Sequence, residues 1–152
     1  MEGSLFMSLD ETVLAHAESH EGIAASFPLM RELRPHLNTP EEYVEQILRQ
    51  QASGYHLLLA WRDGVVTGLA GYREQENLVY GRFLYIDDLV TLPSLRGAGL
   101  GARLLAACQE EAARRGCRKL VLDTRRDNVL AQRFYFRNGM LPHVMRFSRD
   151  LV

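Results

Sequence analysis

The sequence predicts one α/β domain, in which about four helices flank a mixed, mostly antiparallel sheet of six to seven strands. The length of 152 residues fits a single domain spanning 1–152. Two strand patterns joined by Asp63-Gly64 indicate an antiparallel hairpin. Further along, strand patterns over 83–91 and 119–124 enclose a helical pattern, and such a strand–helix–strand unit pairs its two strands in parallel.

The chain begins with weak signals. We expect residues 1–11 to be poorly ordered and residues 12–19 to form a first strand. A helix over 20–34 follows, with apolar residues on one face. Pro28 lies inside this helix and should kink or split it, because proline cannot donate the helical hydrogen bond.

The second helix has a sharper start. Thr39 is a good N-cap, Pro40 suits the first helical position, and Glu42 completes a capping box with Thr39. Gly54 is the natural stop, because glycine readily takes the left-handed conformation that ends many helices. We therefore expect a helix between Thr39 and Gly54.

The remaining elements alternate between strands and helices. Strands over 55–62 and 65–72 form the hairpin, and the strand over 83–91 continues it as a meander. The helix after this strand should end at Gly116, and another should run over 128–138. A last strand over 141–151 would close the sheet.

Composition excludes several classes of protein. Apolar residues make up 47% and charged residues 24%, which is ordinary for a globular domain. A net charge of −1 gives no reason to expect nucleic acid or an anionic membrane as a partner, and no apolar run is long enough to span a membrane. The first residues lack the features of a signal peptide. Cys108 and Cys117 fit neither a disulfide framework nor a metal site, so we expect a cytoplasmic protein without a metal.

A glycine-rich stretch links the strand over 83–91 to the helix that follows it. Gly97, Gly99 and Gly101 leave the backbone free of side-chain bulk where that helix begins. The first amides of a helix have no partner within the helix, and the aligned peptide dipoles add about half a positive charge there. A strand, a glycine loop and a helix start together predict a phosphate-binding cradle.

The glycines alone leave the ligand open. The pattern Gly97-x-Gly99-x-x-Ala102 also fits a looser dinucleotide fingerprint, with Asp123 at about the distance expected for a ribose contact. Only 29 residues follow Asp123, too few to complete a doubly wound sheet. A purely structural glycine turn is the other alternative.

Two motifs carry a resemblance to a known family. The first is Arg96-x-x-Gly99-x-Gly101, and the second, about 30 residues on, is Asn128-Val-Leu-Ala131-Gln-Arg-Phe134-Tyr135-Phe-Arg-Asn-Gly139-Met140. In this order the two motifs resemble the cofactor segments of GCN5-related N-acetyltransferases (the GNAT family). The resemblance is strong over 85–140 and weak before residue 54.

The resemblance implies that acetyl-coenzyme A is the co-substrate and that the glycine loop holds its pyrophosphate. It further implies that the pantetheine arm lies along the strand before the loop, where the Val90 amide would polarise the thioester carbonyl. The implied cofactor-binding residues are Leu89, Val90, Arg96, Gly97, Ala98, Gly99, Leu100, Gly101, Ala102, Asn128 and Tyr135.

The resemblance also implies the catalytic groups. A carboxylate on the strand before the loop would face the amine, and Asp87 occupies that position, with Asp88 as the alternative. Neighbouring strand residues face opposite sides, so only a bulge lets both carboxylates reach one cleft. An ordinary Asp pKa of about 3.9 suits electrostatic attraction of the amine at least as well as base catalysis. Tyr135 would protonate the leaving thiolate, since a phenol stays protonated at neutral pH.

The acceptor side carries fewer signals. By the resemblance, the connection between the first two helices builds the acceptor pocket, where Arg31, Arg34 and His36 could meet an acidic part of the substrate. The alternative is a solvated turn. We expect the five histidines to show no pairing that would suit a metal or a catalytic dyad.

The expected function is acetyl-CoA-dependent N-acetylation of a primary amine on a small molecule or peptide, by direct transfer in a ternary complex. Two alternatives stand beside it: a non-catalytic coenzyme A-binding module on the same fold, and a dinucleotide-binding enzyme. The resemblance is compatible with a homodimer, because dimers are common in the family. The sequence does not name the acceptor.

Overall fold

The computed structural model describes residues 11–152, and its centre is a five-stranded sheet. The strands follow chain order across the sheet: β1 (Val13–His16), β2 (Tyr55–Arg62), β3 (Val65–Asn77), β4 (Gly81–Thr91) and β5 (Lys119–Leu122). All neighbours are antiparallel except β4 and β5, which are parallel. The predicted α/β fold with a mixed, mostly antiparallel sheet is confirmed. We expected residues 1–11 to be poorly ordered, and residues 1–10 of this range lie outside the described residues.

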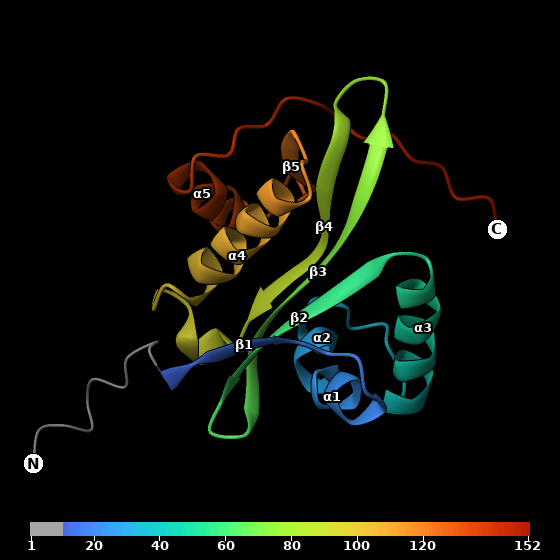
Figure 1. The fold of residues 1–152 in the computed structure, drawn as a ribbon, viewed down its shortest axis with the longest axis vertical. Helices are drawn as coiled ribbons and strands as arrows, with labels where there is room; N and C mark the ends of the chain where they lie inside the picture. The colour runs from blue at the N-terminus through green and yellow to red at the C-terminus, as the bar shows by residue number, and fades with distance from the viewer. Residues whose placement is uncertain (1–10) are drawn as a thin grey trace, which may run out of the picture.

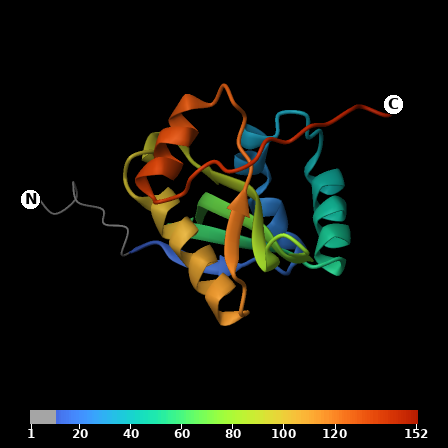
Figure 2. The ribbon, with the colours of Figure 1, turned by 90° about the horizontal axis from the view of Figure 1, so that it is seen from above.

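Helices cover both faces of the sheet (Figures 1 and 2). One face carries α1 (His20–Ala25), α2 (Phe27–Leu33) and α3 (Pro40–Ala52). The other face carries α4 (Leu100–Arg114) and α5 (Val129–Arg137). Among these described helices, none is long and apolar enough to cross a membrane.

Side-chain caps and prolines set the helix boundaries as the sequence indicated. The Thr39 hydroxyl accepts a hydrogen bond of 3.2 Å from the Glu42 amide, at the start of α3. Pro28 lies at the start of α2, and the predicted 20–34 helix is split there into α1 and α2, with Ser26 between them. This split raises the number of helices from about four to five.

The core lies on both sides of the central strands. Along β2, Leu57 and Leu59 pack against α1, α2 and α3, whereas Leu58 and Ala60 pack against α4. Successive strand side chains point to opposite faces, so an apolar run indicates a strand covered on both faces. The sheet is therefore a rigid middle layer whose loops and strand ends are free to carry a site.

The number of strands was overpredicted. The segment 141–151, expected to close the sheet, has no regular secondary structure, and the sheet has five strands instead of six to seven. After α5 the chain crosses the end of the sheet toward the side of α3 (Figures 1 and 2). The prediction rested on apolar side chains alone, which favour a strand only where a strand edge is within reach. β5, the edge strand, has four residues.

Candidate active site

The central feature of the site is a β-bulge where β3 pairs with β4. Gly71 lies opposite Asp88 and Tyr72 lies opposite Ile86, so Asp87 is the extra residue on β4. A bulge breaks the strict alternation of side chains along a strand. As a result, Asp87 and Asp88 line the same pocket, which a regular strand would not allow.

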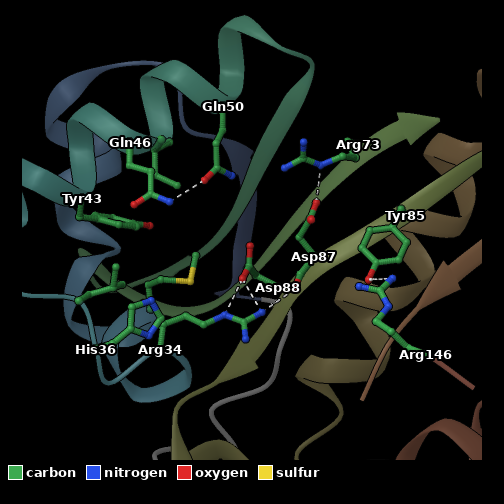
Figure 3. Close-up of a pocket in the computed structure, with 13 residues that line it drawn as sticks. Arg34, His36, Tyr43, Gln46, Gln50, Arg73, Tyr85, Asp87, Asp88 and Arg146 are labelled. Atoms are coloured by element: carbon green, nitrogen blue, oxygen red, sulfur yellow. Dashed lines mark hydrogen bonds and ion pairs between the residues drawn. The ribbon is translucent and has the colours of Figure 1, made fainter. Parts of the chain in front are cut away.

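The pocket lies between the α2–α3 helices and strands β3 and β4, and has a volume of about 440 Å³. Figure 3 shows glutamines of α3 on one wall and the two carboxylates of β4 on the other. Arg146, from the segment after α5, reaches its edge. The lining residues are Met30, Arg34, His36, Leu37, Tyr43, Gln46, Ile47, Gln50, Arg73, Tyr85, Asp87, Asp88 and Arg146.

Asp88 is held on both of its oxygens. Arg34 Nε donates to Oδ1 at 3.1 Å, and Arg34 Nη2 forms an ion pair with the same oxygen at 3.0 Å. The Tyr55 hydroxyl donates to Oδ2 at 2.8 Å. Burial, followed by the charge of Asp88, raises the pKa of Tyr55 well above its usual value, so Tyr55 remains a donor. With both oxygens engaged, Asp88 is placed to fix the bulge and Arg34.

Asp87 is less constrained. Arg73 Nε donates to Asp87 Oδ2 at 2.8 Å, while Arg34 Nη2 donates to the Asp87 backbone carbonyl, also at 2.8 Å. Partial burial raises the pKa of Asp87, although the Arg73 guanidinium acts in the opposite direction. A carboxylate with a raised pKa is a better match for accepting a proton near neutral pH.

The strand that carries the two carboxylates also leads to the glycine loop. Pairing of β4 with β5 ends at Ile86 and Leu122, and beyond this point β4 pairs only with β3 within the described chain. Leu89 and Val90 lie on this part of β4. The side of β4 that faces away from β3 is therefore available to an extended ligand.

The glycine loop follows β4 after a short 3-10 helix, η2 (Pro93–Leu95). Gly97 and Gly99 have φ values of 88° and 89°, in the left-handed region that glycine takes most readily. Gly99 is also the N-cap of α4, and no side chain caps this helix. The start of α4 therefore presents backbone amides without an acidic or capping side chain in front of them.

The two cofactor motifs meet in space. A Cβ atom at Gly101 would lie 3.2 Å from Cζ of Phe134, so α5 packs closely against the first turn of α4. At the start of α5, the Asn128 side chain accepts a hydrogen bond of 3.1 Å from the Ala131 amide. Tyr135 is half-buried on α5, and burial raises its pKa.

Of the residues predicted for the acceptor side, some line the pocket and one does not. Arg34 and His36 line the pocket, whereas Arg31 is exposed on α2 and does not. Two of the histidines contact one tyrosine on the face of the sheet that α4 covers. His16 Nε2 lies 2.7 Å from the Tyr72 hydroxyl, and His56 stacks on the same ring. Among residues 11–152, no group of His, Cys, Asp and Glu could hold a metal ion.

Sequence reasoning missed most of the charged lining. Arg73 and Gln50 line the pocket from β3 and α3, and Tyr55 of β2 reaches Asp88 behind it. Their proximity depends on the register of β2, β3 and β4. One signal was available: Arg73 is a charged residue that directly follows a run of buried residues within the same strand.

Comparison with known proteins agrees with this geometry. The profile of the Acetyltransferase (GNAT) family matches residues 14–140. The chain is 36% identical over 97 residues to the aminoalkylphosphonate N-acetyltransferase of Salmonella typhimurium, an alignment that covers 63% of each chain. It is 30% identical over 95 residues to an aminoglycoside N(6')-acetyltransferase type 1 of the same organism, covering 60% of this chain and 64% of the relative. These alignments thus span slightly less than two thirds of the curated relatives.

The fold has close structural counterparts. The crystal structure of aminoglycoside N-acetyltransferase AAC(6')-Iy in complex with CoA superposes with a TM-score of 0.81 at 21% identity, over 93% of this chain and 95% of the other. The chain belongs to the GNAT acetyltransferase family, because the family profile covers most of its length. The resemblance seen in the sequence is confirmed.

Proposed function

We propose that this chain is an acetyl-CoA-dependent N-acetyltransferase that acetylates a primary amine by direct transfer in a ternary complex. The observation that carries the proposal is the course of β4. One strand runs from the bulged carboxylates at Asp87 and Asp88, past an edge without β5, into the glycine loop at Gly97 and Gly99. An amine site and a phosphate site are thus joined by one stretch of exposed strand edge.

The described residues fit acetyl-CoA. The amides at the start of α4 would hold its pyrophosphate, since Gly97 and Gly99 keep side chains away and no acidic residue lies in the first turn. Leu89 and Val90 would pair with the pantetheine arm, and Asn128 would contact the cofactor from α5. Bound there, acetyl-CoA supplies an acetyl group activated as a thioester.

Two side chains would then move protons. Asp87 would hold the ammonium of the acceptor and take one proton from it, directly or through water, which frees the nitrogen lone pair to attack the thioester carbonyl. The nitrogen would lose a second proton to water as the amide forms, and this balances the proton that the sulfur gains. Tyr135 would give a proton to the sulfur as the C–S bond breaks. Its half-buried position keeps the phenol protonated at neutral pH, because burial raises its pKa. Asp88 would act through position, holding Arg34 and the bulge.

Direct transfer fits the placement of the two thiols. Cys108 is fully buried on the core-facing side of α4, and burial raises its pKa to about 12. Cys117 lies against Glu74, and neither thiol lines the pocket. A thiol nucleophile must ionise and must be reached by the substrate. Neither cysteine meets both conditions, so a covalent acetyl-cysteine is not part of the proposal.

The relatives support a small amine as the acceptor. Their names include an aminoalkylphosphonate, aminoglycosides and glucosamine 6-phosphate as the groups acetylated. The shared chemistry is a primary amine on a small polar molecule. We extend that class to this chain.

We also propose that two copies form a homodimer through residues 141–152. Six apolar side chains in this segment are at least 64% exposed: Leu141, Val144, Met145, Phe147, Leu151 and Val152. Apolar side chains gathered on one extended segment commonly mark an interface. Sedimentation at several concentrations tests this: the wild type should be dimeric and Phe147→Ser should shift toward monomer. A monomeric wild type at all concentrations would reject the dimer.

The test of the activity is a titration followed by a turnover assay. Isothermal titration should show acetyl-CoA binding, and a thiol-release assay with a panel of amines should show acceptor-dependent release of coenzyme A. Tight binding with no release above the solvent rate would favour a non-catalytic coenzyme A-binding module on this fold. Failure to bind acetyl-CoA at millimolar concentration would overturn both. A dinucleotide enzyme is disfavoured, because the sheet is mostly antiparallel.

A further inference from the structure

The charged side chains of the pocket are paired with one another, and this pairing restricts which acceptor can bind. Three arginines, Arg34, Arg73 and Arg146, line it, whereas Asp87 and Asp88 are its only lining carboxylates within the described chain. Each of these carboxylates already contacts a guanidinium, at 2.8 and 3.0 Å. Arg146 is paired as well, with Asp123 outside the lining. A ligand with several positive charges would therefore find no unpaired carboxylate among the described lining residues. An acceptor that also carries a negative charge could pair with an arginine as well as with a carboxylate.

Arg73 has donors to spare on the pocket side. Its Nε is committed to Asp87, but no hydrogen bond between described residues engages its two terminal nitrogens. Figure 3 shows these nitrogens turned toward Gln50 across the pocket. Gln46 Nε2 donates to Gln50 Oε1 at 3.0 Å, so the Nε2 group of Gln50 is left as a donor. Together, the planar guanidinium of Arg73 and the side-chain amide of Gln50 offer hydrogen-bond donors to the oxygens of an acid group.

We propose that the acceptor is a short zwitterionic amine, in which an acid group lies one or two carbons from the primary amine. This inference rests on the proposed acetyltransferase function and names its substrate class. The ammonium would replace the hydrogen bond that Arg73 Nε donates to Asp87. The acid group would bind the guanidinium of Arg73 and the side-chain amide of Gln50. The class includes α- and β-amino acids and short aminoalkylphosphonates.

The length limit follows from the ion pair itself. Arg73 Nε and Asp87 Oδ2 are 2.8 Å apart, so a ligand that pairs with both side chains must carry its two charges close together. A partly buried ion pair is costly to break unless both charges are paired again. A neutral amine would satisfy Asp87 and leave Arg73 unpaired. A long amino acid would hold its acid group out of reach of Arg73.

The first test compares acceptors at saturating acetyl-CoA, with thiol release as the readout. Glycine, β-alanine and aminomethylphosphonate carry the acid group close to the amine. Glycinamide and ethylamine lack it, 6-aminohexanoate separates it, and kanamycin replaces it with further amines. We expect kcat/KM for the short zwitterions to exceed that of every other acceptor by about tenfold or more, because unpaired polar groups reject analogues strongly. A preference between glycine and aminomethylphosphonate identifies the acid group as carboxylate or phosphonate.

The second test changes the guanidinium. Arg73→Gln should collapse the ratio of kcat/KM between glycine and glycinamide toward one, mainly through a higher KM for glycine. Arg82→Gln is the matched control, because Arg82 lies on the neighbouring strand, pairs with Glu74 and does not line the pocket. This control should leave the ratio unchanged. If the role of Arg73 is purely structural, kcat/KM should fall equally for glycine and glycinamide, and their ratio should not change.

The outcomes separate the two proposals. If neutral amines or kanamycin match the short zwitterions, the zwitterion proposal is overturned while the acetyltransferase function stands. The same holds if Arg73→Gln keeps the wild-type ratio. If no acceptor gives thiol release and acetyl-CoA does not bind, both are overturned.

Discussion

Tyr55 on β2 donates a hydrogen bond of 2.8 Å to Asp88 on β4, across the intervening strand β3. The bond is feasible because residue 71 of β3 is glycine: a Cβ atom there would lie 1.7 Å from the Tyr55 hydroxyl. Asp88 in turn accepts a hydrogen bond from Arg34, the residue that caps the C-terminal end of α2. Three strands and a helix are thus tied together at the bulge that brings Asp87 into the pocket.

Gly71→Ala should destabilise the fold and reduce activity. The added methyl group must displace a fully buried tyrosine, and overpacking of this kind costs about 1–3 kcal/mol. Denaturant unfolding measures the loss. Gly22→Ala in α1 is the control, because its Cβ would come no closer than 3.3 Å to the Ser19 hydroxyl and 3.7 Å to Ala17, and alanine favours helix. Equal stability of Gly71→Ala and wild type would mean that Tyr55 is not fixed by this contact.

Asp87→Asn should lower kcat by about 10²- to 10⁴-fold, the usual contribution of a positioned base, with acetyl-CoA affinity retained. Asp87 works in its ionised form, so wild-type activity should fall as pH drops through the pKa of Asp87. Burial raises that pKa above the usual value, and Arg73 opposes the rise. The acid limb of kcat/KM should accordingly move to higher pH in Arg73→Gln, and it should vanish in Asp87→Asn. An unchanged acid limb in Asp87→Asn would assign it to another group.

Tyr135→Phe should lower kcat about 100-fold and leave the affinity for acetyl-CoA unchanged, because it removes a proton donor and keeps the ring. Burial raises the pKa of Tyr135, so the donor stays protonated through neutral pH and any alkaline limb should lie above about 10. Steady-state kinetics and calorimetry on the same samples separate the two effects. Phe136→Leu is the control, since Phe136 is 52% exposed on the same helix. Full activity in Tyr135→Phe would remove this tyrosine from the mechanism.

Gly97→Ala and Gly99→Ala should weaken acetyl-CoA binding. Both residues have φ near 90°, and an L-residue in left-handed backbone costs about 1–2 kcal/mol. Gly116→Ala is the matched control: it lies just after α4, at the opposite end from the loop, with φ of 72°. All three variants should lose stability in denaturant, but only the first two should lose affinity by calorimetry. Equal affinity in all three would move the pyrophosphate away from this loop.

Local signals predicted the elements of this fold well. The Thr39 cap, the Asp63-Gly64 hairpin and the split at Pro28 are each determined within a few residues, so the sequence is enough to find them. The segment 141–151 was different, because a strand depends on a partner edge that no local pattern reveals. Its apolar side chains gave the same signal that a paired strand would give.

The site was predictable in part, for a similar reason. Asp87 and the glycine loop lie on one continuous stretch of chain, and the family resemblance covers that stretch. The bulge that admits both carboxylates needs the register of β3 against β4. The contacts of Tyr55 and Arg73 need that register as well, and they are long-range in sequence. Physical pairing across strands, rather than residue type, decides which charges meet.

Different parts of the chain would bind the acyl donor and the acceptor, and this separation has an evolutionary consequence. The loop and helices that would hold the donor molecule come from the second half of the chain, while α2 and α3 supply the opposite wall of the pocket. Exchange of the segment between α2 and α3 can therefore change the accepted amine without disturbing the acyl donor. Arg34 forms an ion pair across this boundary with Asp88. Divergence of specificity within such a lineage should begin at this residue and its neighbours on α3.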